Sequence, residues 1–234
     1  MAGTIEERLA ELARSEAPAV TRFDANEGLR GGWAVLPSAF NPPTRAHLRL
    51  LDLAEGVAGA EGSAALLTTR NVAKGVEGAS LEDRIGMLLA TRESQPGLAV
   101  LGANQARIAD QAAVLCDTWP DASFDFVLGY DTLVRLFDQQ YYTGAMEAVL
   151  DPFFERHRVI VATRGEVTER EMREWVAEQA SRYADRIVTV ALDREHGRIA
   201  SSEIRSRIEA GEGSDDLPEG VAEYIREHGL YEGT

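Results

Sequence analysis

The chain has 234 residues, of which 44% are hydrophobic and 27% charged, and its formal net charge is −15. This length suits one sizeable α/β domain, and the acidic balance argues against a nucleic-acid partner, which requires a basic face. The single cysteine, Cys116, excludes a disulfide framework and a cysteine-based metal site. No apolar run approaches the roughly 20 residues of a membrane span, and the N-terminus does not resemble a signal peptide. We therefore expect a cytoplasmic protein without a membrane partner.

Apolar periodicity predicts strands and helices that alternate along most of the chain. The first predicted helix covers residues 4–15 and is followed by a break that ends in a glycine cluster at 28–32. The predicted strands are 33–36, 64–69, 98–101, 124–129, 158–163 and 186–192. The predicted helices that follow them are 45–60, 81–93, 104–116, a short helix after 131, 168–182, and then 202–210 and 218–228. Residues 137–154 are rich in aromatics and give no clear pattern.

This alternation predicts an α/β fold with a Rossmann-like, open, mostly parallel sheet and helices on both faces. The strands are near-continuous apolar runs, as expected for strands buried on both faces. No repeat or linker divides the chain, so we expect a single domain over 1–234. Within it, residues 1–30 form an N-terminal helical extension and 198–231 form C-terminal helices.

The turn after the first predicted strand has features of a phosphate site. Thr44 has the chemistry of a helix N-cap, and His47 follows three residues later, near the same helix end. Free N–H groups and the positive end of the helix dipole favour phosphate at such a position. An imidazole and a hydroxyl beside it indicate phosphate chemistry.

Polar residues also follow the other predicted strands: Lys74, Asp131, Arg164, Ser201, Ser202 and Arg205. In an open parallel sheet these strand ends lie along one edge, where ligands bind. Each residue alone is explained equally well as a solvated loop residue or a helix cap, but together they indicate a site. The familiar phosphate loops G-x-x-x-x-G-K-[ST] and G-x-G-x-x-G are absent from the first turn, which indicates a different nucleotide-binding scheme.

Phe40-Asn-Pro-Pro-Thr-Arg-Ala-His47 resembles the first motif of the HxGH nucleotidyltransferase superfamily, especially of nicotinamide and nicotinate mononucleotide adenylyltransferases. Ile199-Ala-Ser-Ser-Glu-Ile-Arg205 is similar to the second motif, Ser-Ser/Thr-x-x-Arg, and Gly129-Tyr-Asp131 to the Gly-x-Asp that holds adenosine ribose. Arg164-Gly165 and the tail over 217–231 also resemble family segments, so the resemblance covers about residues 33–231. Thr44 replaces the first histidine, as in one branch of the family.

The resemblance implies an adenylyltransferase that moves AMP from ATP to nicotinamide or nicotinate mononucleotide, giving NAD or deamido-NAD and pyrophosphate. The implied catalytic residues are His47, Thr44 and Arg205, with Lys74 and Arg164 binding the acceptor. The implied ATP-binding residues are Ser38, Ala39, Phe40, Asn41, His47, Gly129, Asp131, Ser201, Ser202 and Arg205. His47 is expected to donate to the α- or β-phosphate and Thr44 to add a hydroxyl donor. Mg2+ is the implied cofactor, bridging phosphate oxygens without a dedicated set of protein ligands.

Two alternatives stay open at this point. The first is adenylyl or cytidylyl transfer to another phosphorylated small molecule. The second is a nucleotide-binding regulator without turnover, which the replacement of family glycines by Pro37, Ser38 and Ala39 keeps in view. Tyr141, Tyr142 and Phe137 are candidates for stacking on a pyridine ring, although aromatic residues more often pack in a core. Assembly into a homo-oligomer is also left open.

Overall fold

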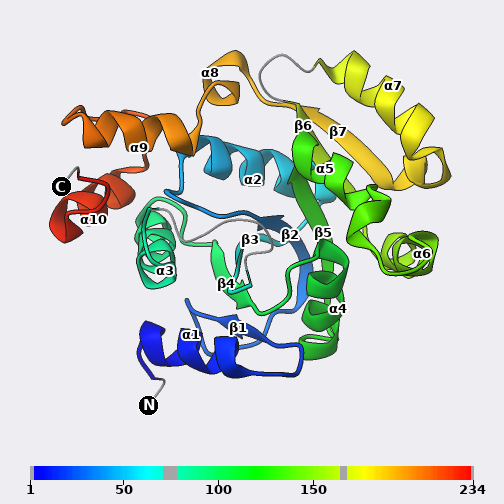
Figure 1. The fold of residues 1–234 in the computed structure, drawn as a ribbon, viewed down its shortest axis with the longest axis horizontal. Helices are drawn as coiled ribbons and strands as arrows, with labels where there is room; N and C mark the ends of the chain where they lie inside the picture. The colour runs from blue at the N-terminus through cyan, green and yellow to red at the C-terminus, as the bar shows by residue number, and fades with distance from the viewer. Residues whose placement is uncertain (1–2, 71–77, 164–167, 233–234) are drawn as a thin grey trace.

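The computed structural model describes residues 3–70, 78–163 and 168–232. Its strands form one seven-stranded sheet in the order β1-β4-β3-β2-β5-β6-β7 (Figure 1). The strands are β1 (Val20–Arg22), β2 (Gly31–Pro37), β3 (Gly62–Thr68), β4 (Ala99–Ala103), β5 (Ala122–Gly129), β6 (Val159–Thr163) and β7 (Ile187–Ala191). All pairings are parallel except that of β1 with the edge of β4. This order confirms the predicted mostly parallel, Rossmann-like open sheet.

Helices cover both faces of the sheet, as predicted. They are α1 (Ile5–Arg14), α2 (Arg45–Ala58), α3 (Leu81–Ala90), α4 (Ile108–Thr118), α5 (Tyr130–Leu136), α6 (Glu147–Arg156), α7 (Glu169–Gln179), α8 (Arg194–Gly197), α9 (Ser201–Glu209) and α10 (Glu219–His228). Short 3-10 turns cover Thr91–Glu93, Gln139–Tyr141 and Ser181–Arg186. None of the described helices is long and apolar enough to cross a membrane.

Each central strand supplies alternate side chains to two separate cores. In β2, Ala34 and Leu36 pack in one core with residues of α1, α2 and α3. Val35, between them, points to the other face and packs with residues of α4, α5, α6 and α7. Successive strand residues point to opposite faces, so a short apolar run fills both layers. This two-sided burial is the physical reason why these strands appear as continuous hydrophobic runs.

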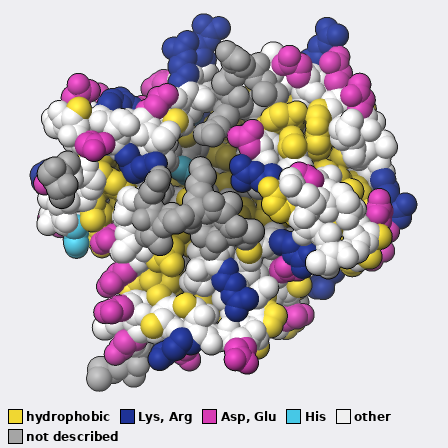
Figure 2. Space-filling view, viewed as in Figure 1, with side chains coloured by type: hydrophobic (Ala, Val, Ile, Leu, Met, Phe, Trp, Pro, Cys, Tyr) yellow, Lys and Arg dark blue, Asp and Glu magenta, His cyan; other side chains and the backbone are white. Residues whose placement is uncertain are grey.

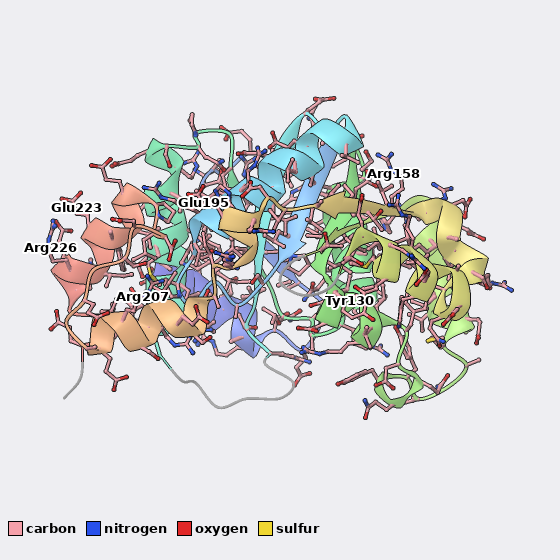
Figure 3. All side chains as sticks on the ribbon, turned by 90° about the horizontal axis from the view of Figure 1, so that it is seen from above. Tyr130, Arg158, Glu195, Arg207, Glu223 and Arg226 are labelled. Atoms are coloured by element: carbon pink, nitrogen blue, oxygen red, sulfur yellow. The ribbon has the colours of Figure 1, made fainter. Side chains whose placement is uncertain are left out.

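A third, smaller core joins the C-terminal helices to α3. It contains Met87 of α3, Ile204 of α9 and Val221 and Ile225 of α10. Figure 3 shows α9 and α10 together at one end of the molecule and α7 at the opposite end. The C-terminal segment therefore docks beside the sheet, next to the helix that follows β3.

Two sequence predictions are wrong in detail. Residues 1–30 are not purely helical, because β1 follows α1 and pairs antiparallel with β4. The helix predicted from residue 104 begins only at Ile108. Asn104 is fully buried instead, and its side chain accepts from the Ala19 N–H at 2.8 Å and donates to the Ala17 carbonyl at 2.8 Å. A buried polar side chain that ties down a neighbouring segment outweighs local helix propensity here.

Candidate active site

The candidate site lies where β2 ends, beside β3 and β5. The β2–α2 loop (residues 38–44) runs from this strand end to the first residue of α2. After β2 the chain adds β3 and then β4 on one side of it, and then β5, β6 and β7 on the other side, so this is the point where the direction of strand addition reverses. Ligands of open α/β sheets bind beyond the carboxyl ends of the strands at this point.

His47 is held in a defined orientation at the start of α2. Its Nδ1 accepts the backbone N–H of Thr44 at 3.1 Å and lies 2.8 Å from the Thr44 hydroxyl. A backbone N–H only donates, so in the neutral imidazole the proton resides on Nε2. Nε2 lies 3.3 Å from Ser38 Oγ, at the end of β2. The ring therefore presents an N–H donor, not a base, toward the β2–α2 loop.

The Thr44 side chain is buried against His47 and is not open to solvent. It is 1% exposed, accepts the His47 backbone N–H at 3.4 Å and contacts the imidazole. Together these contacts form a capping box in which histidine takes the place usually held by Glu or Gln. The sequence predicts a hydroxyl that donates directly to phosphate, whereas in the structure this hydroxyl fixes the ring. The ring of Phe40 also packs against the His47 ring, with centroids 5.1 Å apart.

The second motif meets the first across the β2–α2 loop. Arg205 Nη1 donates to the Asn41 carbonyl at 2.7 Å, and the Ser201 hydroxyl donates to the Pro42 carbonyl at 3.0 Å. These residues are about 160 positions apart in the chain, so the contact depends on the docking of α9. Ser201 is the first residue of α9, which has Ala200 as its N-cap, and Ser202 beside it is exposed.

The side chain of Asn41 is fixed from the C-terminal tail and from the start of α3. Its Oδ1 accepts the Tyr231 hydroxyl at 2.7 Å and the Ala79 backbone N–H at 3.2 Å. Gly78 lies so close that an added Cβ would meet the Asn41 amide at 2.7 Å. Burial raises the pKa of Tyr231, so its hydroxyl stays a donor at neutral pH.

Arg84 of α3 lies beside this cluster. Its side chain is 6% exposed, and its Nε donates to the Ala79 carbonyl at 2.9 Å. Burial lowers the pKa of this guanidinium, nearby Arg205 lowers it further, and Tyr231 opposes the shift. Two guanidinium groups near one another, within an acidic chain, make this corner attractive for an anion.

The predicted ribose residues lie at the end of β5, the strand that pairs with β2. Gly129 ends β5 and is the N-cap of α5, and Asp131 is the second residue of that helix. The Asp131 side chain is exposed and makes no hydrogen bond or ion pair with any described residue. Ala39 is exposed at the other strand end. Lys74 and Arg164, predicted to bind the acceptor, lie outside the described residues.

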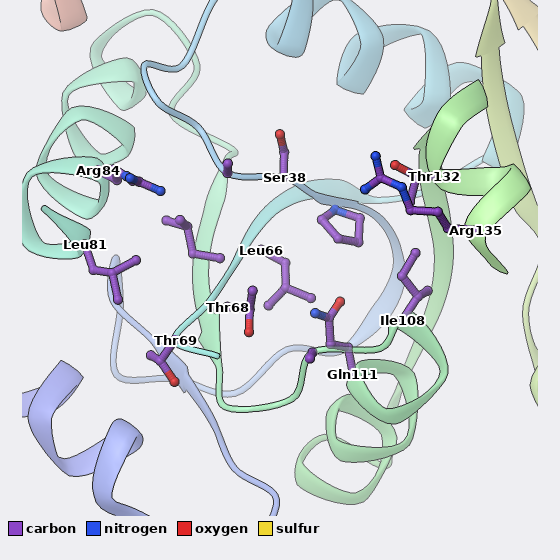
Figure 4. A pocket seen from close by; sticks show the side chains of 14 residues that line it. Ser38, Leu66, Thr68, Thr69, Leu81, Arg84, Ile108, Gln111, Thr132 and Arg135 are labelled. Carbon is purple, nitrogen blue, oxygen red and sulfur yellow. The ribbon is translucent and has the colours of Figure 1, made fainter. Parts of the chain in front are cut away.

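Two adjoining cavities open at these strand ends. The first cavity, about 330 Å3, is lined by Ser38, Ala39, Arg84, Gln111 and Arg135 among others. Figure 4 shows Arg84 and Arg135 on opposite sides of it. The second cavity, about 280 Å3, is lined by Arg70, Arg107, Arg135, Tyr141 and Tyr142 among others. None of the described lining residues is Asp or Glu.

The two cavities adjoin, because they share lining residues, and together they are called the cleft below. The shared residues are Thr68, Ala106, Ile108, Thr132 and Arg135. On this face of the molecule, Figure 2 shows a hollow with a hydrophobic floor and Lys or Arg side chains at its edge. The lining therefore combines apolar walls with positive charge.

Sequence reasoning missed three residues of this region: Arg84, Arg135 and Tyr231. For Arg84 a signal existed, since Leu81, Arg84 and Ile85 share one face of the predicted helix, and a charge on an apolar face is unusual. For Arg135 no local pattern exists, and Tyr231 lies in the tail over 217–231 that resembles family segments but gives this residue no role. Their proximity to the site depends on how α5 and the C-terminal tail pack.

The chain is similar in sequence and fold to several known proteins, although no family model matches it. It is 31% identical over 134 residues to a Schizosaccharomyces pombe protein named for nicotinamide mononucleotide adenylyltransferase activity, spanning 56% of this chain and 52% of that protein. It is 26% identical over 214 residues to a Neisseria meningitidis serogroup B protein named for nicotinate-nucleotide adenylyltransferase activity. This match spans 88% of this chain and 98% of that protein.

Among solved structures, the fold resembles a Plasmodium falciparum nicotinic acid mononucleotide adenylyltransferase complexed with NaAD. The TM-score is 0.64 at 16% identity, covering 86% of this chain and 97% of that one. A nicotinate-nucleotide adenylyltransferase structure from Vibrio parahaemolyticus gives a TM-score of 0.52 at 15% identity. At these identities the structural similarity concerns the fold.

The fold and the two motifs of the site thus resemble those of nucleotidyltransferases. The sequence relatives confirm the more particular resemblance, which is to the nicotinamide and nicotinate mononucleotide adenylyltransferases.

Proposed function

We propose that this protein transfers AMP from ATP to nicotinamide or nicotinate mononucleotide, releasing pyrophosphate. ATP and a pyridine mononucleotide are its partners in this proposal. The observation that carries the proposal is the meeting of the two motifs: His47 at the start of α2 and Arg205 near the start of α9 flank the same loop. Two helix N-termini and their donors converge there, which suits a polyphosphate.

The reaction needs positioning and charge stabilisation more than proton removal. An ionised phosphate oxygen of the acceptor attacks the α-phosphorus of ATP, a new O–P bond forms, and the bond to the β-phosphate oxygen breaks. The acceptor phosphate is already deprotonated, so no general base is required. The fixed Nε2–H of His47 suits a reaction that requires charge stabilisation, because it can donate to the phosphate oxygens on which negative charge develops.

Arg205 and Ser201 are proposed to act on the β- and γ-phosphates. Arg205 offers a permanent charge with forked donors, of which one already holds the Asn41 carbonyl. Gly129 and Asp131 are proposed to hold the adenosine ribose, beyond the end of the neighbouring strand. The roles of Lys74 and Arg164 toward the acceptor stay predictions from sequence.

Mg2+ fits this site as an ion that arrives with the phosphates. No group of three or more His, Cys, Asp or Glu side chains in the described part of the chain gathers to hold a metal. Mg2+ keeps most of its waters and needs few protein ligands when phosphates supply the rest. When bound, it would neutralise charge on the triphosphate, while the protein supplies Arg205, His47 and the loop amides.

The test is an assay of pyrophosphate release with ATP, Mg2+ and a panel of mononucleotides, comparing the wild type with His47→Asn. Asn Oδ1 takes the place of Nδ1 and keeps the bond to the Thr44 N–H, but offers no donor at the Nε2 position. We expect a rate loss of ~10²–10³, because one preorganised donor is removed from the transition state. Thermal unfolding serves as the control, and a near-normal melting temperature shows that the cap is retained.

Other outcomes favour the alternatives. Near-normal turnover by His47→Asn would remove His47 from the reaction. Pyrophosphate release only with a different phosphorylated acceptor would redirect the proposal to that acceptor. ATP binding without release, whatever the acceptor, would identify a regulator.

A further inference from the structure

We propose that Asn104 is a positioning residue for the reaction, because it attaches the N-terminal segment (residues 4–24) to one wall of the cleft. This inference rests on the proposed function and extends it to a part of the chain that neither motif includes. The N-terminal segment contains α1 and β1, and Figure 1 shows both beside β4 at one edge of the sheet. In this proposal the segment holds the cleft in shape as well as covering the edge of the sheet.

Asn104 directly follows β4 and is the point where the N-terminal segment is attached. Its side chain is fully buried, and both ends of its amide are used. Nδ2 donates to the carbonyls of Ser15 at 3.1 Å and Ala17 at 2.8 Å. Oδ1 accepts the Ala19 N–H at 2.8 Å and Gln105 Nε2 at 2.9 Å. These four bonds fix the orientation of the amide, because a carbonyl only accepts and an N–H only donates.

Gln105 connects Asn104 to the lining of the cleft. Its carbonyl accepts two hydrogen bonds of 2.9 Å, one from the Thr68 hydroxyl at the end of β3 and one from Gln111 Nε2 in α4. Thr68 lines both cavities and Gln111 lines the first, and Figure 4 shows both side chains there. A displacement of Gln105 would therefore move lining residues that belong to two different elements.

The amide of Gln111 indicates that a ligand contacts this wall. Because the Gln105 carbonyl only accepts, the Gln111 amide directs its Nε2 to that carbonyl and leaves Oε1 as its other end. This Oε1 is buried and has no hydrogen-bond partner in the structure as described. Buried polar atoms normally have a partner, so an unpartnered acceptor in the lining of a cavity suits a donor on a ligand. Its orientation depends on Gln105, and thereby on Asn104.

A second contact joins the N-terminal segment to the same wall. The Ser15 carbonyl, at the C-cap of α1, accepts from Arg70 Nη2 at 3.4 Å as well as from Asn104. Arg70 follows β3 and lines the second cavity. The C-terminal end of a helix carries a partial negative charge, so the end of α1 favours a cation there. One carbonyl of the segment thus contacts residues that follow both β3 and β4.

The wall lies in the part of the site that the proposed function leaves for the acceptor. Of the proposed ATP contacts, Ser201, Arg205 and Asp131 line neither cavity. Ser38, whose Oγ lies 3.3 Å from His47 Nε2, lines the first cavity, so the cleft reaches from His47 to the ends of β3 and β4. A displaced wall is therefore expected to weaken the use of the mononucleotide more than the use of ATP.

The experiment measures kcat/KM for the mononucleotide and for ATP, each with Mg2+ and a saturating concentration of the other substrate. The mononucleotide is whichever of nicotinate and nicotinamide mononucleotide the wild type uses better. The variants are Asn104→Ala and a matched control, Asp24→Ala. The buried Asp24 carboxylate accepts the Val100 N–H at 2.8 Å, so it attaches the same segment to β4 at the strand end opposite Asn104.

The ratio of the two constants is the informative quantity, because partial unfolding lowers kcat for both substrates alike. In Asn104→Ala we expect kcat/KM for the mononucleotide to fall about fivefold or more relative to that for ATP, a change that the loss of one hydrogen bond can produce. In Asp24→Ala the ratio is expected to stay at the wild-type value, whatever the loss of melting temperature.

The outcomes separate this inference from the proposed function. An Asn104→Ala variant that keeps the wild-type ratio would overturn the inference, as would an equal change of the ratio in Asp24→Ala or a selective fall in kcat/KM for ATP. Asn104→Ser, which keeps a hydroxyl, provides the same comparison if thermal unfolding shows that Asn104→Ala is not folded at the assay temperature. Absence of turnover by the wild type with both mononucleotides would instead overturn the proposed function itself.

Discussion

Gly129 has no conformational reason to be glycine. Its φ is −77° and its ψ 160°, an ordinary extended backbone, and a Cβ added there would meet no atom of the described residues within 4 Å. The surrounding protein would therefore accept a side chain at this position. A close approach of the substrate to the backbone is the remaining physical reason for glycine, and it agrees with the proposed contact to the adenosine ribose.

Gly129→Ala is therefore expected to weaken ATP binding without weakening the fold. The change adds one methyl group in open space, so the free energy of unfolding is expected to stay within about 0.5 kcal/mol of the wild type. KM for ATP, measured at saturating acceptor, is expected to rise severalfold. An unchanged KM for ATP would separate Gly129 from the adenosine site.

At the scale of elements, the C-terminal segment holds the β2–α2 loop from the outside. Arg45, the first residue of α2, donates its backbone N–H to the Asp216 carbonyl at 2.9 Å and its Nε to the Leu217 carbonyl at 3.1 Å. Beyond α10, Tyr231 adopts a positive φ of 63°, which is uncommon for a non-glycine residue. This conformation places its hydroxyl on Asn41. The tail therefore positions the loop without itself lying at the reacting atoms.

Tyr231→Phe tests this coupling, because it removes only the hydroxyl. We expect a loss of about 0.5–1.5 kcal/mol in stability from one partly buried hydrogen bond. We also expect a higher KM for ATP with a smaller change in kcat, since Asn41 keeps the bond from the Ala79 N–H but loses its second restraint.

Tyr224→Phe is the matched control for this change. It removes a hydroxyl from α10 that lies 3.4 Å from Asp83 and has no contact with the loop. A purely structural role for Tyr231 would make the two variants alike, with lower melting temperatures and unchanged KM for ATP.

At the scale of the whole molecule, a buried histidine links stability to pH. His157 is 4% exposed, and its ring contacts the Phe124 carbonyl at 2.8 Å and Cys116 Sγ at 3.8 Å. Burial lowers the pKa of His157, and the hydrogen bond to Phe124 opposes this shift only in part. Of the nearby charges, Arg156 lowers the pKa further and Asp125 raises it. Cys116 is buried, as the sequence predicts, and burial raises its pKa, so the thiol stays protonated.

We therefore expect stability to fall as the pH drops from 7 to 5. In the unfolded chain His157 has a pKa of 6.5, and in the folded protein its pKa is lower. Between these two pKa values the unfolded chain binds up to one more proton than the folded chain, so a lower pH favours unfolding. The free energy of unfolding therefore falls by at most about 1.4 kcal/mol per pH unit, which corresponds to a difference of one bound proton. His157→Asn, which can keep the bond to the Phe124 carbonyl but does not titrate, is expected to flatten the slope in urea unfolding between pH 7 and 5. An unchanged slope in that variant would assign the effect to other groups.

The described strands all belong to one sheet, with both cores against it, which supports the proposal of a single domain. That arrangement follows from the chain order of strands and helices. The chain has a net charge of −15, yet arginines and no described Asp or Glu line the cleft. Composition therefore indicates nothing about the local charge of the site, which depends on which side chains the strand ends bring together.

The sequence by itself determined what depends on near neighbours in the chain. Apolar runs identified every parallel strand, and Thr44 followed by His47 identified the helix start, because periodicity and capping act over a few residues. Only the tertiary structure decided that β1 pairs with β4 and that Tyr231 reaches Asn41. These features depend on packing between segments far apart in the chain, where burial and hydrogen-bond satisfaction outweigh local preference.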